Sequence, residues 1–230
     1  MNVRISAQSQ SNNAIRYMQQ QSQALAKYQD QLSSSQRIKT PSDDPGNYPA
    51  YIRAKADSGR YEAYNQTITS ATSDLNAAND ALGEANDVLT RAKQIALEGV
   101  NGTTDGAGYT ALAAEVDSLL ERMTAAGNTQ LNGQYLFGGT ASGAPPFQLT
   151  AAAGTTTVTY QGTAERARVL IGPGQTVENR YAGDQVFQQA GGDAFQALID
   201  LRDVLKDPNL TDAGKAAALT PRLAAVDAAR

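Results

Sequence analysis

"ITSATSDLNAANDALGEANDVLTRA", residues 68–92, is the stretch that decides how most of this chain folds. One line of large apolar residues recurs at every seventh position: Ile68, Leu75, Leu82 and Leu89. A second line lies three residues further on and consists of alanines: Ala71, Ala78, Ala85 and Ala92. A seven-residue repeat with a small residue in one seam is typical of closely packed helices in a coiled coil or bundle. We therefore predict one helix over about 50–99, with Ile68, Leu75, Leu82 and Leu89 in the core of a helical rod.

The segment "RIKTPSDDPGNYP", residues 37–49, interrupts the helical pattern just before that helix. Prolines restrict the backbone and disfavour helix in the residue before them, so this segment breaks the rod. Ser42, Asp43 and Asp44 are residue types that form turns and cap helix N-termini. Two adjacent aspartates without further oxygen ligands at fixed offsets are a weak metal signal. We predict that the residues of this breaker form a hinge and cap: Pro41, Ser42, Asp43, Asp44 and Pro45.

Residues 8–38, before the breaker, contain nine glutamines and neither proline nor glycine. Met18, Leu25 and Leu32 recur every seventh residue, which predicts a helix with a thin apolar stripe. Such a stripe buries little by itself, so we expect this helix to need a partner and to be mobile in the isolated chain.

The composition and periodicity of the sequence change twice beyond the long helix. A glycine-rich loop over 99–108 precedes a helix that ends near Ala126, and residues 133–192 are then rich in Gly, Thr and Pro with strand-like alternation. Helical patterns return over 193–206 and from Asp212 onward. We predict a mainly α chain with a β-rich insertion (α+β): an elongated, coiled-coil-like rod plus a small β domain. The expected divisions are a terminal helix (1–40), the rod (41–132), the β-rich outer domain (133–192) and the return helices (193–230).

Composition excludes several classes of function. The chain of 230 residues has no cysteine and no histidine, which rules out disulfides, thiol catalysis, Cys/His zinc sites and histidine acid–base chemistry. A formal charge of −4 gives no basic footprint for nucleic acid, and no apolar run is long enough for membrane insertion or a cleaved secretion signal. The carboxylates Asp74, Asp80, Glu84 and Asp87 suit a solvated helix face. We expect no catalytic, cofactor or metal site.

Three stretches carry a resemblance to a known family. "QLSSSQRIKTPSDDPGNYPA" (31–50) resembles the N-terminal signature of the flagellin superfamily, and its Pro-Ser-Asp-Asp-Pro version resembles the hook-associated protein 3 family rather than flagellin itself. "NTQLNGQYLFGGTASGAPPF" (128–147) is similar to the family segment that leads into the variable domain. "YQGTAERARVLIGPGQTVENRYAGDQVF" (160–187) resembles the family's β-rich region.

The resemblance implies a structural role in the bacterial flagellum, where such subunits connect hook to filament. It implies export by flagellar type III secretion without a cleaved signal, and an extracellular location. The implied partners are further copies in a ring, hook-associated protein 1, hook or flagellin subunits, and an export chaperone. Seam residues of the first helix would then form the assembly interface: Met18, Leu25, Leu32 and Ile38.

Alternatives remain beside this interpretation. Within the same class the chain could be a short flagellin. A surface adhesin whose Thr- and Gly-rich insertion binds a ligand belongs to another class, and an enzyme is the least favoured. The family's C-terminal helices continue past residue 230, so we expect a fragment of a longer subunit in preference to a shortened one that needs neighbours.

Overall fold

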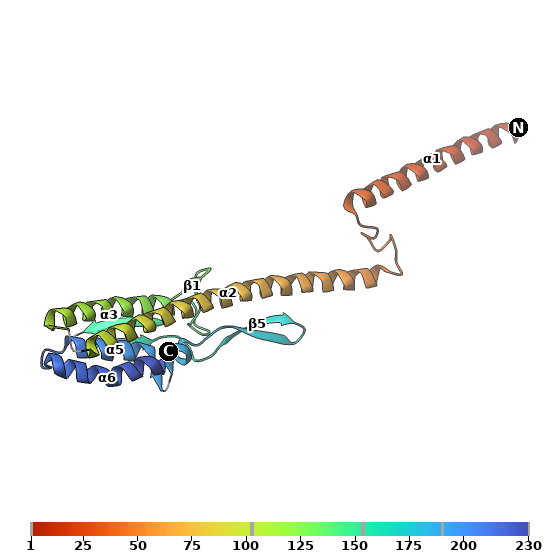
Figure 1. The fold of residues 1–230 in the computed structure, drawn as a ribbon. Helices are drawn as coiled ribbons and strands as arrows, with labels where there is room; N and C mark the ends of the chain where they lie inside the picture. Colours follow the sequence, from red (N-terminus) through yellow and green to blue (C-terminus); the bar gives the residue numbers. More distant parts are fainter. Residues whose placement is uncertain (1, 102–103, 153–154, 190, 230) are drawn as a thin grey trace. The chain divides into compact units, whose positions relative to one another are not determined.

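The computed structural model describes residues 2–101, 104–152, 155–189 and 191–229 (Figure 1). By its internal contacts the chain divides into two units, Met1–Glu62 and Ala63–Arg230. The division falls inside one helix, whereas the sequence predicted boundaries near 40, 132 and 192.

The first unit contains two helical segments separated by the proline-rich breaker. Helix α1 runs over Asn2–Ser34, and helix α2, Tyr48–Val100, begins in this unit and continues into the next. Helix α2 agrees closely with the prediction of about 50–99, whereas α1 begins and ends earlier than the predicted 8–38. Pro49 lies in the first turn of α2, where backbone N–H groups have no partner within the helix, so the ring costs no hydrogen bond.

The second unit is built from the rest of α2 and three further helices: α3 (Gly106–Gly127), α5 (Ala194–Lys206) and α6 (Asp212–Ala229). Ion pairs show that α2 and α3 are antiparallel, because Glu84 meets Arg122 and Arg91 meets Glu115. Helix α5 packs on both α3 and α6. No helix in the described ranges has the length and apolar character needed to span a bilayer.

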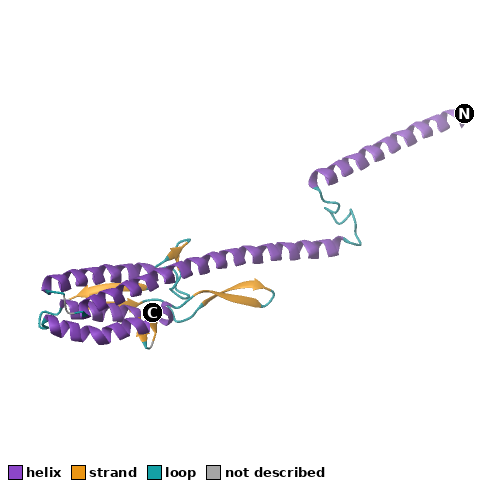
Figure 2. Ribbon diagram, in the orientation of Figure 1, coloured by secondary structure: helices purple, strands orange, loops and turns teal. Residues whose placement is uncertain are grey.

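The β-rich segment forms separate hairpins, not one sheet (Figure 2). The paired antiparallel strands are β1 (Gln130–Leu131) with β2 (Gln134–Tyr135), β3 (Phe147–Ala152) with β4 (Thr155–Tyr160), β5 (Ala167–Gly172) with β6 (Gln175–Arg180), and β7 (Gln188–Gln189) with β8 (Gly192–Asp193). A short helix, α4 (Gly183–Phe187), follows β6. The predicted α+β fold is confirmed.

One hydrophobic core joins the β3–β4 hairpin and its neighbouring segments to the helices of the second unit. All 4 phenylalanines of the chain, Phe137, Phe147, Phe187 and Phe195, lie in it and are nearly or fully buried. The ring centroids of Phe147 and Phe195 are 4.9 Å apart, and those of Phe137 and Phe187 are 5.1 Å apart. The β-rich segment therefore shares its core with α5 and does not form one of its own.

The structure corrects part of the predicted rod core. Leu89 is buried at 4% exposure and Leu75 is half-buried, but Ile68 and Leu82 are 41% and 39% exposed. The side of α2 that faces the core carries the alanine line instead: Ala71, Ala78, Ala85 and Ala92. Small side chains allow close approach of neighbouring helices, which leaves the larger line at the edge of the contact.

Candidate assembly surface and bend

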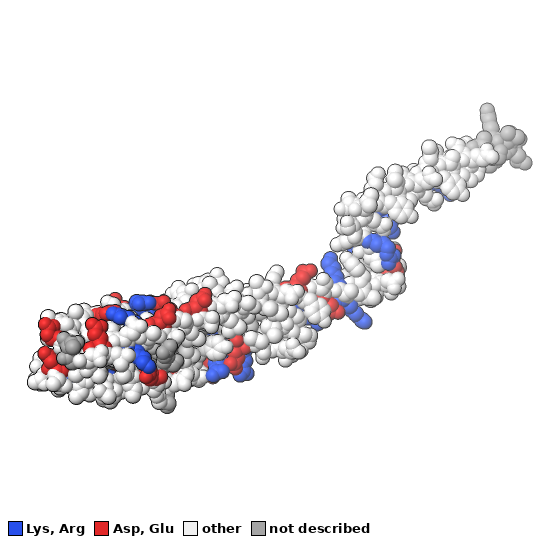
Figure 3. Space-filling model, in the orientation of Figure 1, with Lys and Arg blue, Asp and Glu red and all other residues white. Residues whose placement is uncertain are grey.

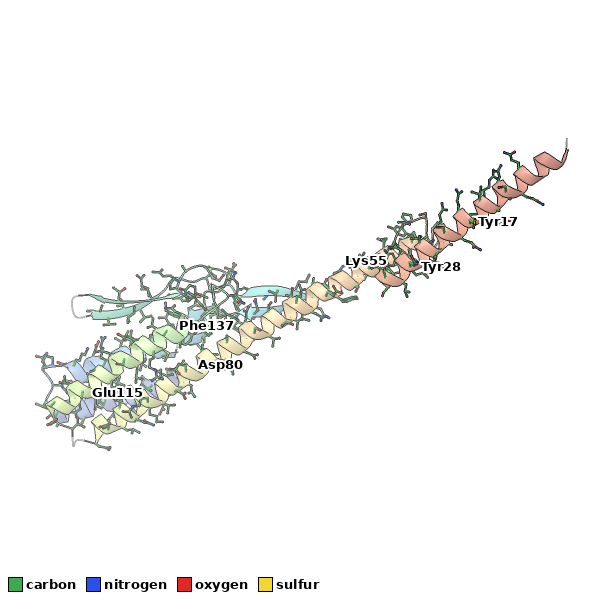
Figure 4. All side chains as sticks on the ribbon, turned by 90° about the horizontal axis from the view of Figure 1, so that it is seen from above. Tyr17, Tyr28, Lys55, Asp80, Glu115 and Phe137 are labelled. Carbon is green, nitrogen blue, oxygen red and sulfur yellow. The ribbon has the colours of Figure 1, made fainter. Side chains whose placement is uncertain are left out.

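Helix α1 carries large apolar side chains that its own unit does not cover. Met18, Leu25 and Leu32 are 73%, 59% and 83% exposed. The other exposed members are Ile15, Tyr17 and Tyr28. Met18, Leu25 and Tyr28 line one shallow hollow along the helix. Figure 4 labels Tyr17 and Tyr28 on α1. We call this set the α1 stripe.

Charge on the first unit lies mainly beside the α1 stripe and not within it. Arg16 is the only charged residue of the sequence between residues 8 and 26. Charged side chains gather instead at the segment that follows α1 (Figure 3). A helix with an uncharged, apolar and exposed face suits contact with another helix better than contact with water.

Ser35–Asn47, the segment between α1 and α2, is tied together through the two predicted aspartates; we call it the bend. The Asp43 carboxylate accepts hydrogen bonds from the backbone N–H groups of Lys39 (3.1 Å) and Thr40 (3.0 Å) and from the Thr40 hydroxyl (3.0 Å). It also pairs with the Lys27 ammonium of α1 at 2.9 Å. The pKa of the Asp43 carboxyl is well below its usual range, chiefly because of Lys27 and to a lesser extent because of the donors of Thr40 and Lys39.

Asp44 has a different role beside the start of α2. Its carboxylate accepts the backbone N–H of Asn47 at 3.2 Å and the Asn47 side-chain amide at 3.0 Å, and it pairs with Arg37 at 3.0 Å. Asn47 chiefly, with help from Arg37, lowers the pKa of Asp44. The backbone carbonyl of Asp44 accepts the N–H of Tyr48, so the residue leads directly into the helix.

The remaining predicted bend residues fall into two groups. Pro41, Ser42 and Pro45 lie in the turns of the bend, and the Ser42 hydroxyl is hydrogen-bonded to Thr40 at 2.9 Å. Ile38, predicted to face other subunits, is 7% exposed, and this prediction is corrected. The left-handed backbone of Ser35, with φ 52°, follows the last residue of α1.

The sequence missed one polar contact inside the second unit. Asp74, expected on a solvated face, is only 7% exposed and accepts a hydrogen bond from Asn179 of β6 at 2.8 Å. The contact joins residues 105 positions apart and fixes the β5–β6 hairpin to α2. A signal was present, because Asp74 lies three residues after Ala71 and four before Ala78, on the alanine side of the helix.

Within the ranges that the structure describes, no three His, Cys, Asp or Glu side chains gather into a group that could hold a metal ion. The raised pKa values of Tyr109 and Tyr160 have a structural cause, since burial disfavours their charged forms.

Comparison with known proteins places this geometry in context. The family described as bacterial flagellin N-terminal helical region matches residues 5–142. Flagellar hook-associated protein 3 of Salmonella typhimurium is 25% identical over 200 residues, which are 82% of this chain and 63% of that protein. The protein of the same name from Escherichia coli is 22% identical over 169 residues, or 73% of this chain and 51% of its own length. The chain thus spans between about half and two thirds of these curated relatives.

Solved structures share the fold. A flagellar hook-associated protein from Vibrio parahaemolyticus superposes with a TM-score of 0.71 at 19% identity, covering 83% of each chain. The flagellar junction protein FlgL from Legionella pneumophila gives a TM-score of 0.65 at 16% identity, covering 78% of this chain and 93% of its own. The resemblance predicted from residues 31–50, 128–147 and 160–187 is confirmed.

Proposed function

Because the chain belongs to the family of the bacterial flagellin N-terminal helical region, we propose that it is a subunit of the flagellum that connects hook to filament. It would act by self-association and helix contacts, without catalysis. The curated relatives carry the name hook-associated protein 3, and a structural neighbour is called a junction protein. These names support the junction role over that of a filament subunit.

The observation that carries the proposal is the exposed α1 stripe. A chain that leaves Met18, Leu25 and Leu32 this exposed on one helix has a surface suited to other subunits. These three residues have the seven-residue spacing that is typical of a coiled-coil seam. We assign these three residues, and no longer Ile38, to the assembly interface.

The proposal includes the partners and the route expected from the family. Copies of the chain would form a ring between hook-associated protein 1 and the first flagellin subunits. An export chaperone would hold the chain before flagellar type III secretion delivers it, without a cleaved signal, to the outside of the cell. The formal charge of −4 gives no reason to invoke nucleic acid.

Deletion of the gene tests the proposal directly. Cells without it should keep intact hooks, lack filaments and shed unpolymerised flagellin into the medium, as seen by electron microscopy and by gel analysis of the medium. A plasmid copy should restore the filaments. Loss of filaments with no other flagellin in the medium would make the chain the filament subunit itself. Normal filaments would refute both roles and favour an adhesin.

A further inference from the structure

The bend is held to α1 by more polar contacts than a flexible connection between two helices requires. Lys27 of α1 pairs with Asp43, and Asp30 of α1 accepts from the Lys39 ammonium at 2.8 and 2.9 Å. In addition, the Gln31 side-chain amide of α1 donates to the backbone carbonyl of Arg37 at 2.9 Å. Three side chains from the last two turns of α1 thus hold three different parts of the bend.

Asp43 is the common acceptor in this arrangement. It receives one bond from α1 and three from the bend itself, and two of those three donors are backbone N–H groups. Its side chain is only 18% exposed, whereas that of Lys27 is 49% exposed. Isolated surface ion pairs contribute little to stability, but a carboxylate that also satisfies backbone N–H groups fixes the local backbone.

We propose that the bend and the last two turns of α1 form a preformed ionic latch, which holds the base of α1 in the free chain before any partner binds. The charged groups that face Asp43 and its partners are Lys27 and Asp30 on α1, and Arg37, Lys39 and Asp44 in the bend. Ile38 lies in the same segment and is only 7% exposed. The latch goes beyond the flagellar role, because it belongs to the free chain, and at the base of α1 it replaces the expectation that the whole helix is mobile there.

The latch has a consequence for the α1 stripe. Met18 and Leu25 lie on the same helix as Lys27 and Asp30. A closed latch therefore fixes the end of the helix that carries the stripe.

The latch also has a pH dependence of known sign. Because the folded pKa of Asp43 is lowered, the stabilisation is complete above the ordinary aspartate pKa and is lost as pH falls through the folded value.

Hydrogen exchange on the whole chain tests the latch at its own atoms. The amides of Lys39 and Thr40, which donate to Asp43, should be protected at neutral pH in the wild type and should exchange freely in Asp43→Asn. Asp57→Asn is the matched control, because it removes an exposed ion pair with Arg60 on α2 and should leave both amides protected. Equal exchange at Lys39 and Thr40 in wild type and Asp43→Asn would overturn the latch.

A distance measurement gives a second, independent readout. The chain has no cysteine, so spin labels can be placed at Gln23→Cys on α1 and Gly59→Cys on α2 without other changes. At Gly59 a Cβ would meet nothing within 4 Å. We expect a narrow distance distribution that broadens in Asp43→Asn and at acid pH, while circular dichroism shows the helices retained. A broad distribution in the wild type, or a narrow one that survives Asp43→Asn, would refute the proposal.

Discussion

Phe147 shows how closely single residues of this chain are packed. It is 1% exposed, and two glycines far apart in the sequence lie against its ring. A Cβ on Gly127 would lie 2.6 Å from the ring, and one on Gly183 would lie 2.7 Å from it. Asn128 holds the same residue from the side, since its amide group donates to the Phe147 carbonyl and accepts the Phe147 N–H. These contacts fix the point where α3 meets the β3–β4 hairpin.

Gly127→Ala and Gly83→Ala should have opposite effects on stability. Both glycines are helical, and alanine is the better helix former by about 1 kcal/mol. Gly83 has open space around it, so its replacement should raise the free energy of unfolding by roughly 0.5–1 kcal/mol. Gly127→Ala should lower it by roughly 1–3 kcal/mol, because the added methyl overpacks a buried ring. Urea denaturation followed by circular dichroism measures both, and a stabilising Gly127→Ala would contradict the packing described for Phe147.

At the scale of elements, α6 supplies a hydrogen-bond donor to the C-terminal end of α5. The Lys215 ammonium on α6 donates to the backbone carbonyl of Leu205, in the last turn of α5, at 2.8 Å. It also lies 5.2 Å from the centroid of the Tyr109 ring on α3. The last carbonyls of a helix have no partner within it and carry partial negative charge, so a lysine from a neighbouring helix is well placed there. One buried side chain thus joins α3, α5 and α6.

Lys215→Met should therefore be costly, whereas Lys206→Met should not. The first change leaves the Leu205 carbonyl buried without its donor, and we expect the free energy of unfolding to fall by about 1–3 kcal/mol. Lys206 pairs with Asp117 at the surface, where such a pair contributes at most about 1 kcal/mol. Chemical denaturation of the two variants side by side gives the comparison. An equal decrease in the free energy of unfolding for both variants would mean that the Lys215 contact stabilises the fold no more than a surface ion pair does.

The elements themselves could largely be predicted from the sequence. Periodicity located α1, α2, α3 and α5, and the Pro-Asp-rich breaker located the bend, because these signals are local. The sequence could not show which face of α2 is buried. The large apolar residues, such as Ile68 and Leu82, and the alanines repeat with the same period. Burial of Asp74 and of Ile38 depended on residues that approach only in the folded chain. Pairing of Asp43 with Lys27, sixteen positions away, was equally hidden from the sequence.

At the scale of the whole molecule, the two units differ in whether their large apolar residues are buried or exposed. The second unit holds the large core, in which Leu198 and Leu201 are fully buried. In the first unit the large apolar residues of the α1 stripe are exposed instead, and polar contacts join α1 to the bend. Substitutions in the two units should accordingly be separable by the property that they change.

Leu25→Gln and Leu198→Ala test that separation. Leu25 is 59% exposed and glutamine is an equally good helix former, so the free energy of unfolding should stay within about 0.5 kcal/mol of the wild type. Leu198→Ala opens a cavity in the core and should cost about 2–5 kcal/mol. If the α1 stripe is an interface, Leu25→Gln should abolish recovery of the chain with sedimented flagella, although the free chain is as stable as before. Gln23→Ala, at an exposed position off the stripe, is the control and should sediment normally. Normal sedimentation of Leu25→Gln would remove Leu25 from the interface and leave the exposure of the α1 stripe without the role proposed for it.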